Sequence, residues 1–297
     1  MCTDNTSAGL CVLAECTTDA RQWYLQNGLQ LSPDKSEALI VGTSNQLRVV
    51  MTSVSSMPSV SMAGVDLPVA DDMKVLGVVL DRRLTFHKHV STMARSCNYH
   101  ALAIRHIWHL LTTELAQMLA CSLILSKIDY CNAVLHGAPN YIIKKLQRVQ
   151  NNAARIVLQE PRRSHTTPLL KRLHWLPIQQ QIDYKVAVLT FKVRSTSMPL
   201  YLWPMIKDQE HVHNLWSATM SLSQPSSRTT FVKRTFRCSV PAIWNLLPKT
   251  VIDSDSVTIS KSAKERLNMR NNVSVDAKIV MYRIRCRLSR LPRGSKQ

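Results

Sequence analysis

The fold is decided by residues 140–157, which read NYIIKKLQRVQNNAARIV. Apolar residues recur here every three or four positions, the spacing that places them on one face of an α-helix. These residues are Ile142, Ile143, Leu146, Val149, Ala153, Ile156 and Val157. The opposite face is polar, and a regular stripe runs along it through Lys144, Arg148, Asn151 and Arg155. The stretch therefore predicts an amphipathic helix that buries one face and presents bases on the other.

Helical spacing continues on both sides of this stretch. Upstream, it predicts one long helix over residues 86–111 and a second over residues 115–134. Downstream, a short helix is expected over residues 168–175 and a longer one over residues 182–193, on either side of a proline that interrupts the helical pattern. Residues 195–227 are rich in proline and predict loops with short helical pieces.

The first 84 residues follow a different pattern. A helix is expected over residues 10–26, closed by Asn27-Gly28 because glycine adopts a positive φ without strain. Short strands are expected over residues 29–31, 37–42, 59–63 and 73–80, with an exposed connection after residue 42. Gly77 is interpreted as a bulge or a point of close packing inside the last strand. The fold class predicted for the whole chain is α+β, a small unit with short antiparallel strands followed by a mainly helical region.

The charge is strongly positive and unevenly placed. The chain has 38 Lys and Arg against 19 Asp and Glu. Residues 1–72 carry three basic and eight acidic residues, whereas residues 73–297 carry 35 basic and 11 acidic residues. A positive field of this size attracts polyanions, and nucleic acid is the expected partner class. The candidate contacts are Lys144, Lys145, Arg148, Asn151, Arg155, Arg162 and Arg163.

Local motifs for other chemistry are missing from the sequence. The closely spaced histidines have no Cys or carboxylate at metal-ligand spacing, and no glycine-rich phosphate loop or nucleophile motif is present. Asp71-Asp72 is the one adjacent carboxylate pair, and two-metal catalysis needs carboxylates that converge on the ions. A turn of solvated acids is the favoured interpretation of this pair, and no metal site is predicted.

The expected location is intracellular, in the nucleus or the cytoplasm. No run of apolar residues reaches the length of a membrane span, and the first residues lack the pattern of a secretory signal. The eight cysteines form no C-x-x-C pair, which is typical of reduced thiols in a protein core.

Four blocks of the sequence resemble a known family. They read WYLQNGLQLSPDKSE at 23–37, VLGVVLD at 75–81 followed by LTF and His89, LHWLPI at 173–178 followed by IDYK, and SVPAIWNLLP at 239–248. In this order they resemble the reverse transcriptases of jockey-like non-LTR retrotransposons. In that family the first block follows the catalytic palm motif, the second lies near the primer grip, and the last two belong to the thumb and the C-terminal region.

The resemblance implies a domain layout and an activity. Residues 1–84 would be the end of the palm, 85–194 a helical thumb, 195–260 a C-terminal region with loops and short helices, and 261–297 a basic, disordered tail. The family activity is RNA-directed DNA polymerisation, for which a complete enzyme uses Mg²⁺. Lys35 matches the family's turn lysine, which can approach the leaving pyrophosphate.

The sequence departs from the family at the catalytic centre. The Tyr-Ala-Asp-Asp signature is absent, and Cys2-Thr3-Asp4-Asn5 resembles it only faintly, with an amide in place of the second acid. An amide supplies no anionic ligand for a metal pair. No catalytic residue and no cofactor are therefore expected in this chain, which would bind the template–primer backbone of RNA or DNA without polymerising. Two alternatives stay open, a co-opted RNA- or DNA-binding module and a helical protein-interaction scaffold.

Overall fold

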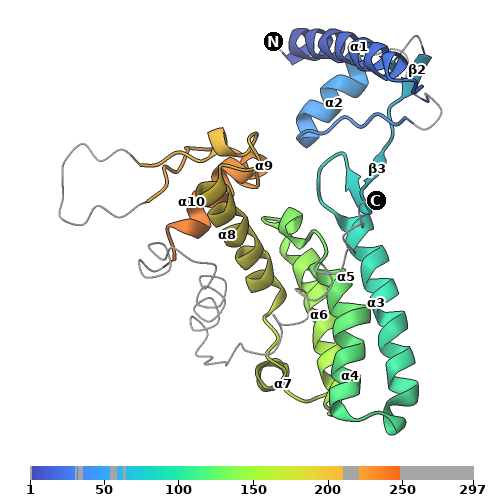
Figure 1. Cartoon of the computed structure of the whole chain (residues 1–297), viewed down its shortest axis with the longest axis vertical. Helices are drawn as coiled ribbons and strands as arrows, with labels where there is room; N and C mark the ends of the chain where they lie inside the picture. Colours follow the sequence, from blue (N-terminus) through green and yellow to red (C-terminus); the bar gives the residue numbers. More distant parts are fainter. Residues whose placement is uncertain are drawn as a thin grey trace, which may run out of the picture. The chain divides into compact units, whose positions relative to one another are not determined.

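The computed structural model describes residues 2–30, 32, 36–53, 59–62, 65–209 and 221–247. The chain divides into two compact units, Met1–Thr92 and Met93–Gln297. The described residues form a mainly helical structure with two small antiparallel sheets of two strands each (Figure 1). The prediction of mixed α+β content with short antiparallel strands is confirmed at this level. The predicted tail after residue 260 lies outside the described residues.

Unit 1 contains two helices and two β-hairpins. Its elements are α1 (Cys2–Gln26), α2 (Ser44–Ser53), β1 (Ser59–Met62), β2 (Val65–Pro68), β3 (Asp72–Val75) and β4 (Val78–Asp81). Strands β1 and β2 pair with Val60 opposite Leu67, and β3 and β4 pair with Lys74 opposite Val79. Gly28 closes α1 with a φ of 72°, as the sequence predicted.

Two predicted strands do not form in the described part of unit 1. Among the described residues between 29 and 42, strand pairing is limited to a single parallel bridge from Ala38 to Val69. The expected connection after residue 42 contains a helix, α2, because Thr43 and Gln46 form a capping box. The Thr43 amide donates to Gln46 Oε1 at 2.9 Å, and the Gln46 amide donates to Thr43 Oγ1 at 3.4 Å.

The predicted strand over residues 73–80 is a hairpin. Leu76 and Gly77 have φ values of 46° and 84°, so the chain reverses between β3 and β4. Two consecutive residues with positive φ are what a type I′ hairpin turn requires, and glycine accepts this conformation without strain. Gly77 is therefore a turn residue, and its interpretation as a bulge was wrong.

Asp81 connects the second hairpin to helix α3 (His87–Ile107). Its carboxylate accepts hydrogen bonds from the Thr85 amide at 3.0 Å, the Thr85 hydroxyl at 2.9 Å and the Phe86 amide at 2.7 Å. One turn into α3, His89 is buried and its Nδ1 lies 3.5 Å from the Val79 amide. The second sequence block therefore forms one local structure, a hairpin joined to a helix start.

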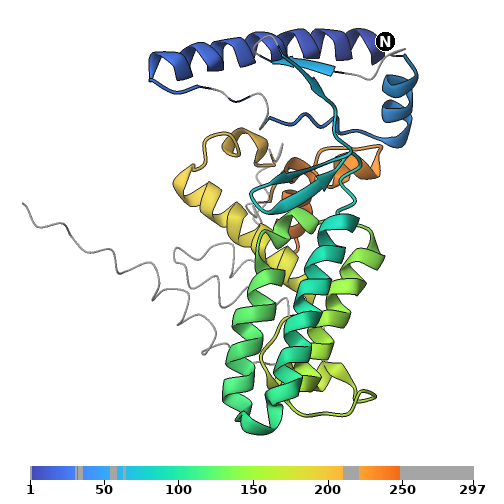
Figure 2. The same ribbon diagram turned by 90° about the vertical axis from the view of Figure 1, so that its right-hand side faces the viewer.

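Unit 2 is a helical assembly. After α3 come η2 (Trp108–Leu110), α4 (Thr113–Ala120), the π-helical turn η3 (Cys121–Leu125), α5 (Ser126–Asp129), η4 (Asn132–Leu135), α6 (Asn140–Val157), α7 (Thr166–Arg172), α8 (Ile178–Thr196), η5 (Trp203–Met205), α9 (Thr230–Lys233) and α10 (Phe236–Trp244). Helix α3, the run from α4 to α5, and α6 lie side by side in both views (Figures 1 and 2). The helix predicted over residues 140–157 matches α6 at both ends. The helix predicted over residues 115–134 ends at α5 and is followed by the separate turn η4.

A cluster of buried apolar residues lies around α8 and α10 in unit 2. Its buried residues are Val186, Ala187, Leu222, Val240, Ile243, Trp244 and Leu247.

Within the described ranges, no helix has the length and apolar character needed to cross a membrane. Six cysteines have described side chains and are free thiols, of which Cys97 and Cys238 are buried and Cys11, Cys16 and Cys131 are exposed. The expectation of core thiols therefore holds for only part of the set.

Candidate nucleic-acid interface

Helix α6 is anchored by its apolar face. Ile142, Leu146 and Val157 are at most 1% exposed, and Ile143, Val149 and Ala153 are also buried. The helix begins after Pro139, whose carbonyl accepts from the Ile142 amide at 2.9 Å. Proline fixes its own φ and suits a helix start. The buried face predicted from the spacing is confirmed, and it fixes the direction in which the opposite face points.

Four exposed residues follow one face of α6 after its first residue. Tyr141, Lys144, Arg148 and Asn152 follow one another at intervals of three or four and are all exposed. We call these four residues the basic face. A tyrosine ring beside two cations is a combination that suits nucleic acid, because the cations contact phosphates and the ring can stack on a base.

Two residues of the predicted stripe are engaged inside the protein. Asn151 Oδ1 accepts a hydrogen bond from Gln147 Nε2 at 2.8 Å. Arg155 donates through Nε and Nη2 to the Ser164 carbonyl at 3.3 and 3.2 Å. The stripe available for contacts is thus shorter than the sequence predicted, and Lys145, which is half-buried, lies beside it.

Arg155 holds a turn that carries two further bases. Arg162 and Arg163 are exposed in the turn after α6. The turn is fixed from both sides, because Ser164 also donates to Glu160 Oε2 at 3.1 Å while its carbonyl is held by Arg155. Residues 140–176 contain eight basic residues and a single acid, Glu160. The two arginines are therefore presented by an ordered turn in a strongly positive part of unit 2.

Each carboxylate of the Asp71-Asp72 pair forms an ion pair with a basic side chain. Arg82 Nη2 lies 3.0 Å from Asp71 Oδ1, and Lys88 Nζ forms an ion pair with Asp72 Oδ2. Arg82 also donates to the carbonyls of Val69 and Ala70, which ties the pair to the local backbone. Among the described residues, no group of three or more His, Cys, Asp or Glu could hold a metal ion. Lys35, the predicted turn lysine, lies outside the described residues.

The sequence analysis did not predict a set of hydrogen bonds made by glutamine side chains. Gln150 is fully buried on α6, and its Nε2 donates to the Leu176 carbonyl at 2.8 Å. Gln147 Oε1 accepts from the Ile178 amide at 2.9 Å, and Gln181 donates to the same Leu176 carbonyl at 2.6 Å. These bonds fix the Leu-Pro turn at the start of α8 to α6. The signal in the sequence was a polar residue, Gln150, on the apolar face of the helix.

The last sequence block has a comparable structural role. Asn245 Oδ1 accepts from the Leu222 amide at 2.8 Å, and Asn245 Nδ2 donates to the Leu222 carbonyl at 2.9 Å. One side-chain amide thus pairs with both backbone groups of a fully buried residue. Beside it, the Arg194 guanidinium lies 5.5 Å from the centre of the Trp244 ring and 3.1 Å from Asp208 Oδ1.

Compared with protein-family models, with curated proteins and with solved structures, the chain gave no match.

Proposed function

We propose that this chain is the C-terminal part of a reverse transcriptase of a jockey-like non-LTR retrotransposon. In this proposal the helical unit binds the backbone of template–primer nucleic acid, and the chain does not polymerise by itself. The four sequence blocks support the family, and the absence of the Tyr-Ala-Asp-Asp signature supports the lack of polymerase activity.

The observation that carries the binding proposal is the exposed basic surface of residues 140–176. Lys144 and Arg148 project from one face of a helix whose other face is buried, and an ordered turn presents Arg162 and Arg163. Contacts of this kind meet phosphates, which carry no sequence information. The expected binding is therefore tight at low salt and tolerant of sequence.

The test replaces two bases of the basic face, in the variant Lys144→Glu with Arg148→Glu. Binding of the full chain to an RNA–DNA hybrid is measured by fluorescence anisotropy over a range of salt concentrations. Counterion release makes the logarithm of the binding constant fall linearly with the logarithm of salt concentration. We expect the variant to bind more weakly on every sequence, with a slope that is shallower by about 0.7 to 0.9 for each phosphate that the protein no longer neutralises.

The matched control carries Arg105→Glu and Lys192→Glu. Both residues are exposed in unit 2 outside residues 140–176, and the change in net charge is the same. We expect the control to keep the slope of the unmodified chain. Equal losses of affinity in the two variants would show that only net charge matters and would overturn the assignment of the site. Binding that does not depend on salt would favour the protein-interaction scaffold.

A further inference from the structure

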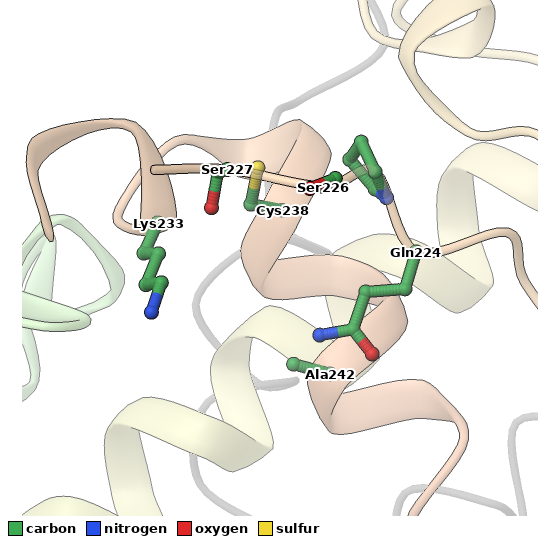
Figure 3. Close-up of a pocket in the computed structure, with 7 residues that line it drawn as sticks. Gln224, Ser226, Ser227, Lys233, Cys238 and Ala242 are labelled. Carbon is green, nitrogen blue, oxygen red and sulfur yellow. The ribbon is translucent and has the colours of Figure 1, made fainter. Parts of the chain in front are cut away.

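A pocket of about 480 Å³ lies in unit 2 where residues 224–227 pass over α9 and α10, and none of its lining residues belongs to α6 (Figure 3). Its polar lining residues are Gln224, Ser226, Ser227 and Lys233, and the wall contributed by α10 consists of Cys238 and Ala242. Figure 3 shows Lys233 at one side of the pocket and Gln224 at the other, with Ser226, Ser227 and Cys238 between them. The pocket thus has a cationic end and an amide end.

The segment that covers the pocket, residues 224–227, is anchored on both sides by hydrogen bonds. Before this segment, the Asn245 side chain forms hydrogen bonds with the backbone N–H and carbonyl of Leu222, which is fully buried against α10. At the end, the Thr229 hydroxyl accepts from the Val232 amide at 3.3 Å and caps α9. Because both ends are anchored, the backbone of residues 224–227 is held without a ligand, and ligand binding has to order mainly the lining side chains.

The polar lining side chains have no structural task of their own. Within the described residues, the side chains of Gln224, Ser226, Ser227 and Lys233 make no hydrogen bond or ion pair. Residues 221–247 contain four basic residues, Arg228, Lys233, Arg234 and Arg237, and no acid. One ammonium group, two hydroxyls and an amide therefore face a cavity in a positive field, which favours an anionic ligand.

We propose that this pocket binds a phosphomonoester of mononucleotide size. Such a group carries nearly two negative charges at neutral pH and three acceptor oxygens. Lys233 supplies the opposite charge, the serine hydroxyls donate to the phosphate oxygens, and Gln224 recognises a polar group at the far end of the ligand. The volume is within the range of about 300 to 1,000 Å³ that is usual for small-ligand sites. The pocket shares no lining residue with the basic face of α6, so this proposal does not depend on the proposed function.

The test measures binding of adenosine 5′-monophosphate, adenosine and inorganic phosphate to the full chain by isothermal titration calorimetry. We expect the monophosphate to bind and both partial ligands to bind at least about tenfold more weakly, since each lacks one end of the recognition. Lys233→Gln should weaken binding of the monophosphate about tenfold, the size expected when a charged hydrogen bond is removed. Lys233 is exposed, so the variant should keep the thermal midpoint of the unmodified chain.

The matched control is Arg237→Gln, which removes the same charge from an exposed residue that does not line the pocket. It should bind the monophosphate within about twofold of the unmodified chain. A second readout is alkylation of Cys238, measured by peptide mass spectrometry, because the ligand should shield this thiol and leave the exposed Cys131 unchanged.

The source of the phosphate is separated by two oligonucleotides that differ only in a 5′-phosphate. A preference for the phosphorylated strand that disappears in Lys233→Gln identifies a nucleic-acid end as the ligand, and no preference identifies a free mononucleotide. The proposal is overturned if adenosine or inorganic phosphate binds as tightly as the monophosphate, if none of them binds, or if Arg237→Gln loses as much affinity as Lys233→Gln. The variant Lys144→Glu with Arg148→Glu should bind the monophosphate normally, so this test and the test of nucleic-acid binding can fail separately.

Discussion

Asp81 is kept ionised by the residues that follow it in the chain. Burial by itself raises the pKa of this carboxyl, but hydrogen bonds from Thr85 and Phe86 outweigh burial and leave the pKa below its usual value. A group with a lowered pKa in the folded state stabilises the fold above its unfolded pKa. This contribution is lost as the pH falls through the folded value.

We expect Asp81→Asn to destabilise unit 1 by about 1 to 2 kcal/mol at pH 7, because one of the two acceptor oxygens becomes a donor. The difference from the unmodified chain should begin to shrink below about pH 4, where the Asp81 carboxyl is protonated in the unfolded chain, and it should be lost as the pH falls through the lower pKa of the folded state. Urea unfolding at several pH values measures both effects. Asp71→Asn is the control, because Asp71 is exposed and its ion pair with Arg82 should contribute less than about 1 kcal/mol. A loss of stability that stays constant down to pH 3 would contradict this role of Asp81.

Single residues also show where sequence reasoning about the site stopped. The spacing placed Lys144, Arg148 and Arg155 on one stripe of α6, and the helix puts the first two in solvent. Arg155 differs because its partner, the Ser164 carbonyl, belongs to a turn nine residues later. The conformation of that turn depends on tertiary contacts that periodicity does not describe. The sequence could therefore identify the cations, but it could not separate the two that face solvent from the one that contacts the Ser164 carbonyl.

At the scale of elements, the spacing of apolar residues along the sequence predicted long helices well and short strands poorly. Helix α6 has the predicted ends because apolar residues recur along its whole length. Residues 73–80 are apolar on both sides of Leu76-Gly77. The spacing of apolar residues therefore could not distinguish one strand from two. The missed signals were local, namely the Leu-Gly turn and the capping box at Thr43 and Gln46.

Gly137 joins two elements by allowing them to come close. It has a φ of 68°, and a Cβ atom at this position would lie 2.7 Å from Cγ of Arg234, which directly follows α9. Gly28 has a similar φ of 72°, but a Cβ there would meet nothing within 4 Å. The two glycines therefore share the backbone requirement and differ in the steric one.

We expect Gly137→Ala to destabilise unit 2 more than Gly28→Ala destabilises unit 1. Gly28→Ala should cost about 1 to 2 kcal/mol, the strain of a side chain in the left-handed region. Gly137→Ala should cost at least about 1 kcal/mol more, because Arg234 must also move. Chemical denaturation followed by a probe in each unit gives both values. Equal costs would mean that Arg234 yields freely and that the close approach is unimportant.

At the scale of the whole molecule, the two units differ in how much apolar surface they bury. The buried apolar residues described in unit 1 are Leu67, Val69, Val78, Phe86 and Val90. Helix α1 leaves large apolar side chains exposed, among them Trp23 at 57% and Leu25 at 55%. Unit 2 buries complete faces of α6 and α8. If unit 1 is the end of a palm, its exposed apolar residues would contact palm elements that this sequence does not contain.

This difference predicts uneven hydrogen exchange along the chain. Backbone amides exchange slowly where opening must expose a large buried core, and quickly where few apolar contacts resist opening. We expect fast exchange in α1 and in the hairpins of unit 1, and exchange at least about tenfold slower in α6 and in the part of α3 that belongs to unit 2. Mass spectrometry of the full chain at neutral pH measures both regions in one sample, so solution conditions cannot cause the difference. Equal protection would mean that unit 1 has a complete core of its own, and a polymerase remnant would then be a poorer explanation than an independently folding binding protein.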